Sequence, residues 1–151
     1  MMLPEPFFGI MIAVGLTETL TFISGFTLGV VPGFVTGCSI IIISDIATLP
    51  GAWTPFIALI IGLIGIIAGV MRSVVATPTV GMMALSALLL TLMSETLQNV
   101  WVALFYNVPV VATMVIGLST LIAALANNII MFTTVGLRII PIISDSSARR
   151  P

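Results

Sequence analysis

Three acidic residues, Glu18, Asp45 and Glu95, lie within long apolar stretches of this 151-residue sequence. In a membrane, a carboxylate at the centre of a helix costs on the order of 3 kcal/mol by insertion scales, so such residues are candidates for ligand binding, proton transfer or hydrogen bonding between helices. Asp45 ends its apolar stretch and is predicted to lie near a membrane surface. Glu18 falls near the middle of its stretch, where a hydrogen bond to another helix and a ligand or proton role are both open.

Glu95 belongs to a polar patch, Ser94-Glu95-Thr96-Leu97-Gln98-Asn99-Val100-Trp101, in an otherwise apolar segment. Gln98 and Asn99 follow it at positions i+3 and i+4, so the three side chains share one face of a helix. Such a face needs protein or water beside it rather than lipid. We therefore expect it to bind a polar ligand, with packing against another helix as the alternative. The later pair Asn127-Asn128 is expected to hydrogen-bond between helices.

Other reactive side chains are scarce. The chain has no lysine and no histidine, and its single cysteine, Cys38, cannot form an internal disulfide. We therefore expect no catalytic residue, no metal site and no cofactor. A phosphate-binding loop needs a lysine, so an ATP-dependent step would belong to a partner.

The composition indicates an integral membrane protein. Hydrophobic residues make up 60% of the chain and charged residues 6%, and the mean hydropathy is +1.35. A soluble domain carries about 25% charged residues, so a soluble enzyme, a secreted domain and a disordered segment are excluded. The net charge of −1 offers no basic patch for nucleic acid.

Five apolar stretches have about the length that a helix needs to cross a bilayer, roughly 20 residues. We expect an all-α polytopic transmembrane bundle of about five membrane-spanning helices, at residues 7–29, 30–47, 53–71, 79–106 and 108–135. The Leu49-Pro50-Gly51 turn separates the second stretch from the third. Residues 1–143 are predicted to form one transmembrane domain, followed by a polar cytoplasmic tail at 144–151.

Glycines recur at every fourth position from Gly25 through Gly29 and Gly33 to Gly37. Small residues at this spacing let membrane helices approach closely, so the first two spans are expected to pack tightly. Pro32 interrupts the series and is expected to mark the turn between them. A second glycine stripe, in the third span, comprises Gly62, Gly65 and Gly69.

The arginines predict the orientation in the membrane. Arg72 lies between the third and fourth spans, and Arg138, Arg149 and Arg150 follow the fifth. With five crossings all of them lie on one side, which the positive-inside rule makes cytoplasmic. The amino terminus is then outside, and the first span is expected to be retained because no basic residue precedes it.

Several glycine-rich motifs lie between Ile23 and Met71. They read Gly25-Phe-Thr-Leu-Gly29, Gly33-Phe-Val-Thr-Gly37, Ser44-Asp45-Ile46, Pro50-Gly51-Ala52-Trp53-Thr54-Pro55-Phe56 and Gly62-Leu-Ile-Gly65-Ile-Ile-Ala68-Gly69. This third of the chain resembles the S components, the substrate-binding membrane subunits of energy-coupling factor (ECF) transporters.

The resemblance implies a helical membrane protein that captures a vitamin-like micronutrient from outside. It would deliver that cargo by toppling within a complex of a transmembrane coupling protein and cytoplasmic ATPase subunits. Members of the family usually have six helices, so this chain looks like the same fold without its first helix, which carries the docking motif. The remaining helices would begin outside and end inside, as the arginines independently predict.

In S components the cargo lies in the outer half of the membrane, and the predicted topology brings several polar and aromatic residues to that level. The candidate substrate-binding residues are Asp45, Trp53, Glu95, Gln98, Asn99 and Asn107. Thr54, Trp101 and Tyr106 lie at the same level, where interfacial anchoring is the alternative for the two aromatic residues. The alternative function is a structural or ion- or proton-conducting small subunit of a larger membrane complex, with a membrane-embedded enzyme as a weaker third possibility.

Overall fold

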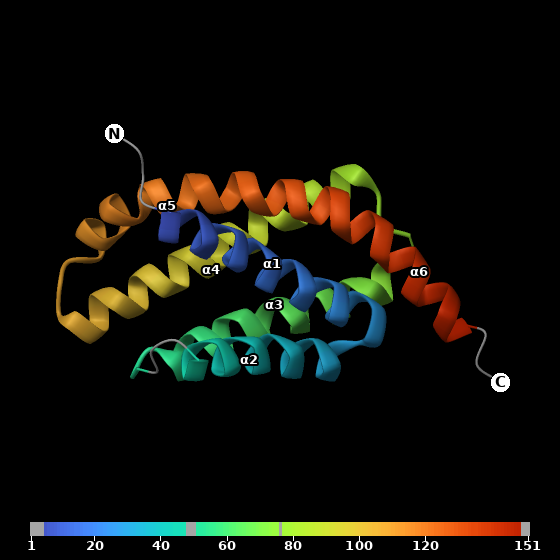
Figure 1. Ribbon diagram of the computed structural model, residues 1–151, viewed down its shortest axis with the longest axis horizontal. Helices are drawn as coiled ribbons and strands as arrows, with labels where there is room; N and C mark the ends of the chain where they lie inside the picture. Colours follow the sequence, from blue (N-terminus) through green and yellow to red (C-terminus); the bar gives the residue numbers. More distant parts are fainter. Residues whose placement is uncertain (1–4, 48–50, 76, 149–151) are drawn as a thin grey trace.

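The computed structural model describes residues 5–47, 51–75 and 77–148, with side chains over 15–47, 51–75 and 77–143. Every element in this part of the chain is helical (Figure 1). In order they are α1 (Glu5–Leu28), α2 (Val30–Ala47), α3 (Thr54–Val74), α4 (Val80–Tyr106), α5 (Val110–Met131), the π-helical segment η1 (Phe132–Gly136) and α6 (Leu137–Ala148). The expected all-α bundle is confirmed.

Several of these helices can cross a membrane. Four segments are long and apolar enough to do so: Val30–Ala47, Thr54–Val74, Val80–Tyr106 and Val110–Ile143. The helix α1 has 24 residues, which also exceeds the roughly 20 that a crossing needs. The helices therefore follow the five predicted apolar stretches closely.

The helices α1, α2 and α3 approach one another through glycine. A β-carbon added to Gly25 would lie 2.2 Å from the carbonyl oxygen of Gly65, and one added to Gly33 would lie 2.5 Å from the α-carbon of Gly25. A hydroxyl pair, Ser24 and Thr36, joins α1 to α2 at 2.9 Å. The prediction that the first two spans pack tightly is confirmed, and α3 is part of the same contact. We call Gly25, Gly33 and Gly65 the glycine seam.

The turn between α1 and α2 differs from the prediction. It lies at Gly29, whose φ of +107° is a conformation that glycine adopts readily. Pro32 does not mark the turn but sits in the first turn of α2. The backbone nitrogens of a first helical turn have no partner within the helix, so proline is tolerated there.

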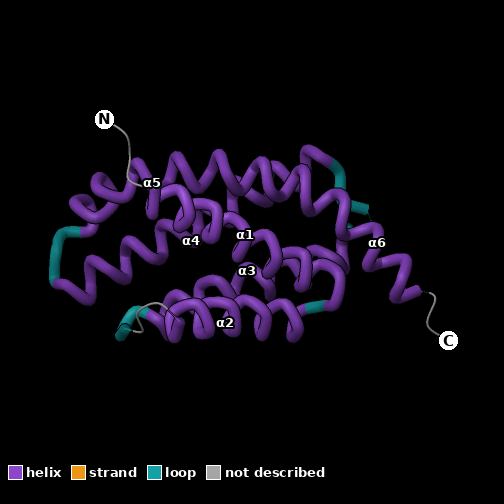
Figure 2. The backbone as a smooth tube through the Cα atoms, in the orientation of Figure 1, coloured by secondary structure: helices purple, strands orange, loops and turns teal. Residues whose placement is uncertain are grey.

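The helix α1 is central, because it contacts α2 and α3 on one side and α5, η1 and α6 on the other. The helices α4 and α5 pack against each other and complete the bundle (Figure 2). Phe22 of α1 lies at the core, with its ring centroid 5.9 Å from that of Phe26 and 4.8 Å from that of Phe132. The core thus joins the amino-terminal helices to the carboxyl-terminal ones.

The last helical stretch is longer than predicted. Through η1 the helix α5 continues into α6, with Pro141 inside α6. The hydroxyl of Thr133 donates to the carbonyl of Ile129 and that of Thr134 to the carbonyl of Ile130, each at 2.6 Å. These bonds give partners to backbone carbonyls beside the π-helical segment η1, whose turn is wider than that of an α-helix. The proposed division into a membrane domain at 1–143 and a cytoplasmic tail at 144–151 stays a prediction. The helix α6 continues past residue 143, and residues 149–151 lie outside the described part.

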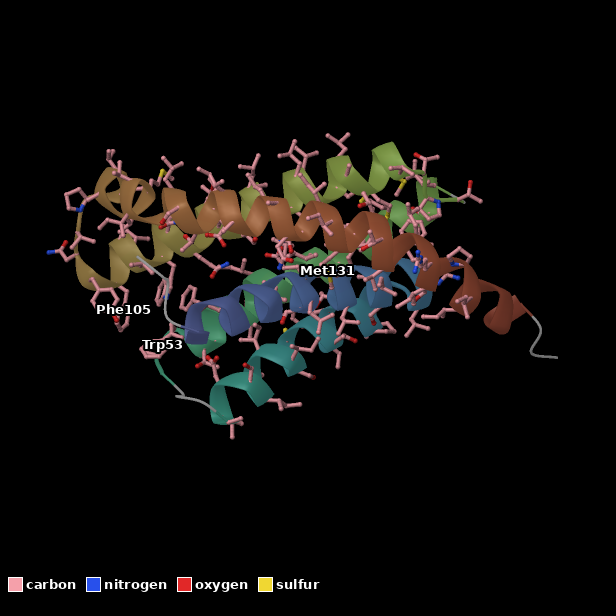
Figure 3. The ribbon with its side chains drawn as sticks, turned by 45° about the horizontal axis from the view of Figure 1, so that its top comes forward. Trp53, Phe105 and Met131 are labelled. Carbon is pink, nitrogen blue, oxygen red and sulfur yellow. The ribbon has the colours of Figure 1, made fainter. Side chains whose placement is uncertain are left out.

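The connections gather at two ends of the bundle. The α1–α2 turn, the α3–α4 connection and α6 lie at one end, which we call the arginine end because Arg72 and Arg138 belong to it (Figure 1). The α2–α3 and α4–α5 connections lie at the other, which we call the aromatic end because it carries Trp53 and Phe105 (Figure 3). The two arginines thus lie at the same end, as the five-span count requires.

Candidate functional site

Glu18 is at the centre of a buried polar network. Its side chain is 1% exposed and accepts hydrogen bonds from three neighbours. The hydroxyl of Ser94 donates to Oε1 at 2.7 Å, the hydroxyl of Thr91 donates to Oε2 at 3.3 Å, and the Nδ2 amide of Asn128 also donates to Oε2. The same amide donates to Thr91 Oγ1 at 2.7 Å. We call Glu18, Thr91, Ser94 and Asn128 the Glu18 network.

Three helices supply this network. Thr91 and Ser94 stand three residues apart on α4 and therefore share a face, while Asn128 comes from α5. Gly15 lets α5 come near α1, because a β-carbon there would lie 2.1 Å from Nδ2 of Asn127 and 3.0 Å from Oδ1 of Asn128. The network therefore depends on a small residue one turn before Glu18.

Glu95 lies beside the network. It follows Ser94 directly, whose hydroxyl lies 2.7 Å from Glu18 Oε1, and it is half-buried. The predicted ligand-binding patch on α4 is thus adjacent in sequence to the Glu18 network.

Asn99 is held by protein contacts. Its Nδ2 donates to the backbone carbonyl of Glu95 at 2.8 Å, and a β-carbon at Gly117 would lie 2.8 Å from its Oδ1. The hydroxyl of Thr113 donates to the carbonyl of Asn99 at 3.1 Å. The Asn99 side chain therefore faces α5, which agrees with the packing alternative for this residue. Gln98 is half-buried on the same helix.

Asp45 and Trp53 lie at the aromatic end, where α2 passes into α3. Asp45 Oδ2 accepts a hydrogen bond from the hydroxyl of Thr54, and that hydroxyl also accepts from the backbone nitrogen of Gly51 at 3.2 Å. The indole of Trp53 lies over Gly51, because a β-carbon there would come within 2.4 Å of the ring. Asp45 is thus part of the structure that closes this connection.

An aromatic stack joins the start of α3 to α4. The ring of Phe56 lies on Trp101 with a centroid distance of 3.3 Å and an interplanar angle of 11°, and Trp101 is 5.5 Å from Phe105. Phe105 in turn meets Tyr106 edge to face at 5.1 Å. Trp53 and Phe105 consequently lie at the same end of the molecule (Figure 3).

Asn107 has a backbone role. It ends α4 with a φ of +52°, the left-handed conformation that asparagine adopts more readily than most residues, and it is exposed. The predicted site residues therefore form two groups. Asp45, near the end of α2, and Trp53, just before α3, lie on either side of the α2–α3 connection, whereas Glu95, Gln98 and Asn99 lie on α4 and Asn107 directly follows it.

Part of the Glu18 network could not be assigned from the sequence. Glu18, the pair Asn127-Asn128 and, within the polar patch, Ser94 stood out there, but Thr91 did not, and no link between Ser94 and Glu18 was predicted. The available indication was the spacing of Thr91 and Ser94, since a threonine and a serine three residues apart stand on one face of an apolar helix. Among the residues that the structure describes, no group of three or more His, Cys, Asp or Glu side chains could hold a metal ion.

Comparisons with protein-family models, with curated proteins and with solved structures return no match for this chain. The class of protein therefore follows from its own features. The chain is an all-α polytopic bundle whose helices are long and apolar enough to span a membrane.

Proposed function

We propose that the chain is the substrate-capture membrane subunit of an ECF-type, ATP-driven transporter for a vitamin-like micronutrient. The stacking of Phe56 on Trp101 is the observation that carries this proposal. It brings the start of α3, within the region at residues 23–71 that resembles S components, beside α4, which bears the polar patch at Glu95, Gln98 and Asn99.

In this proposal the aromatic end faces outside and receives the cargo. Glu95 and Gln98 would fix a polar group of the ligand, while Trp53 would contact an apolar or aromatic part, as in pockets with a few placed polar groups. The arginine end faces the cytoplasm by the positive-inside rule. Energy would come from partner ATPases through a transmembrane coupling protein.

The orientation has a direct test on a Cys38→Ser background. Ala52 and Ser73 are both exposed, one at the α2–α3 connection and the other near the end of α3. Single cysteines at these positions should react with an impermeant thiol reagent from opposite sides of the membrane. Labelling of both from one side would contradict the five-span arrangement.

The function is tested by purifying the chain in mild detergent and identifying the small molecules that denaturation releases by mass spectrometry. We expect one micronutrient to be enriched, less of it from Glu95→Gln, and unchanged amounts from Thr120→Val, an exposed site on α5. The same purification should recover a larger membrane protein and ATPase subunits. Recovery of a homo-oligomer alone, with no enriched molecule, would contradict the proposal.

A second candidate is a structural subunit of a larger membrane complex, and the Glu18 network favours it. A carboxylate that accepts hydrogen bonds from α4 and α5 can hold a bundle together without any ligand. That candidate predicts copurifying membrane subunits but no bound micronutrient, and no uptake that depends on ATP.

A further inference from the structure

All three neighbours of Glu18 can donate to its carboxyl group. The hydroxyls of Ser94 and Thr91 and the amide of Asn128 lie within hydrogen-bond distance of a carboxyl oxygen, and the Ser94 hydroxyl also lies 3.1 Å from the carbonyl of Thr91. An ionised carboxylate would accept from all three, whereas a protonated carboxyl group would itself donate to one of the hydroxyls. A buried charge is stable only when a group of opposite charge or a full set of hydrogen bonds compensates it.

The described residues supply no positive charge at this position. Arg72 donates to the carbonyl of Thr27, nine residues beyond Glu18 or about 13 Å along α1. Arg138 is exposed and lies ten residues beyond Asn128, about 15 Å along that helix. The distances from Glu18 to the two described arginines therefore exclude an ion pair.

The helices around Glu18 add no positive charge that could neutralise it. The helix α4 carries a second acid, Glu95, one residue after Ser94, and α5 carries no titratable residue. On α2, Asp45 bonds Thr54 at the aromatic end and Cys38 donates to the carbonyl of Ala58 at 3.3 Å. None of the described groups on these helices supplies a cationic partner for Glu18.

Asn128 provides a further oxygen at the same place. Its side chain is 0% exposed, and its Oδ1 has no hydrogen-bond partner. A half-turn of the amide would exchange this oxygen with Nδ2, which now contacts both Glu18 Oε2 and Thr91 Oγ1. The network would then offer two carboxyl oxygens, two hydroxyl oxygens and one amide oxygen as ligands.

We propose that the Glu18 network binds one small monovalent cation, a proton or a sodium ion, in the interior of the bundle. Hard cations prefer oxygen ligands, and an acid inside a membrane protein commonly marks an ion or proton site. The proposal does not depend on the capture function, because it needs neither a micronutrient nor partner subunits.

Infrared difference spectroscopy on the full-length protein in lipid tests this proposal. The band of a protonated carboxylic acid that disappears in Glu18→Gln reports the state of Glu18 alone. We would follow this band between about pH 5 and pH 10, and at fixed pH with sodium chloride against potassium chloride and N-methylglucamine chloride. A band that sodium removes and the other salts do not identifies a sodium site. A band that only pH changes, reversibly, identifies a proton site.

If the intensity of this band changes neither with pH nor with sodium, the proposal is overturned. The carboxyl group would then have only a packing role. Asn128→Ala should lower the sodium affinity, or shift the proton titration, by about tenfold through the loss of one bond to a charged group. Thr120→Val is the matched control on α5 and should leave the titration unchanged. A failure of the Asn128 variant to fold would leave the wild-type titration as the deciding measurement.

Discussion

One face of α1 comes into backbone contact with α2 and α3 at the glycine seam, whereas the face that carries Glu18 meets α4 and α5 through hydrogen-bonding side chains. Between membrane helices, close packing and hydrogen bonds replace the hydrophobic effect, which lipid does not supply. The seam depends on the absence of side chains, which lets the backbones approach closely, and it contains no titratable group. The Glu18 network gains stability from specific polar atoms, whose protonation and partners can change.

The largest effect on stability is expected from adding a side chain within the glycine seam. A β-carbon at Gly65 would lie 2.2 Å from the carbonyl carbon of Gly33, and backbone cannot move aside as a flexible side chain can. Gly65→Val should therefore lower the free energy of unfolding by about 3 kcal/mol or more. Thermal unfolding in detergent, followed by circular dichroism, would measure this.

Gly81 is the matched control for this experiment. It is a helical glycine with nothing within 4 Å of its added β-carbon, so Gly81→Val should leave the unfolding temperature nearly unchanged. Equal losses in the two variants would mean that helix propensity, and not close approach, determines the effect.

A smaller loss is expected from the polar face of α1. Asn128→Leu removes the donor shared by Glu18 and Thr91 and should cost about 1.5–3 kcal/mol, the usual range for hydrogen bonds to charged groups. The unfolding temperature of this variant would be compared with that of Thr120→Val, whose residue is exposed on the same helix. A loss no greater than the control's would show that the network contributes little to stability.

The patch on α4 should affect ligand affinity. Glu95→Gln and Asn99→Ala are each predicted to weaken binding by roughly 1 to 3 kcal/mol, the cost of an unpaired buried polar group. Titration calorimetry with the identified cargo would measure it, and Glu95→Gln is the cleaner of the two because Asn99 also packs against Gly117. Unchanged affinity in both variants would move the binding site elsewhere.

The smallest effect is expected at the α2–α3 connection. Thr54→Val removes the hydroxyl that bonds Asp45 at a partly exposed position, for a loss of about 0.5–1.5 kcal/mol. The midpoint of thermal unfolding reports it. Ser73→Ala is a suitable control, since Ser73 bonds only a carbonyl of its own helix among the contacts described and is exposed. A loss larger than that of Asn128→Leu would reverse the ranking of the two regions.

Much of the fold could be predicted from local sequence. The long apolar stretches determine where helices form, because every backbone polar group in a membrane must be bonded within its own helix. The glycine spacing predicted which faces of α1 and α2 come close. The turn between α1 and α2 lies at Gly29, whereas the sequence predicted it at Pro32. A proline in the first turn of a helix and a proline in a loop cannot be told apart by their local sequence.

The sequence by itself determined that Glu18 lies inside an apolar helix and that Glu95, Gln98 and Asn99 share one face of another. Only the tertiary structure decided that Glu18 meets Ser94 and Asn128, 76 and 110 residues away, and that Asn99 faces α5. The physical reason is that helical periodicity assigns each residue to a face of its own helix. Which faces meet depends on close contacts such as Gly15 with Asn127 and Phe56 with Trp101, which form only when the whole bundle is assembled.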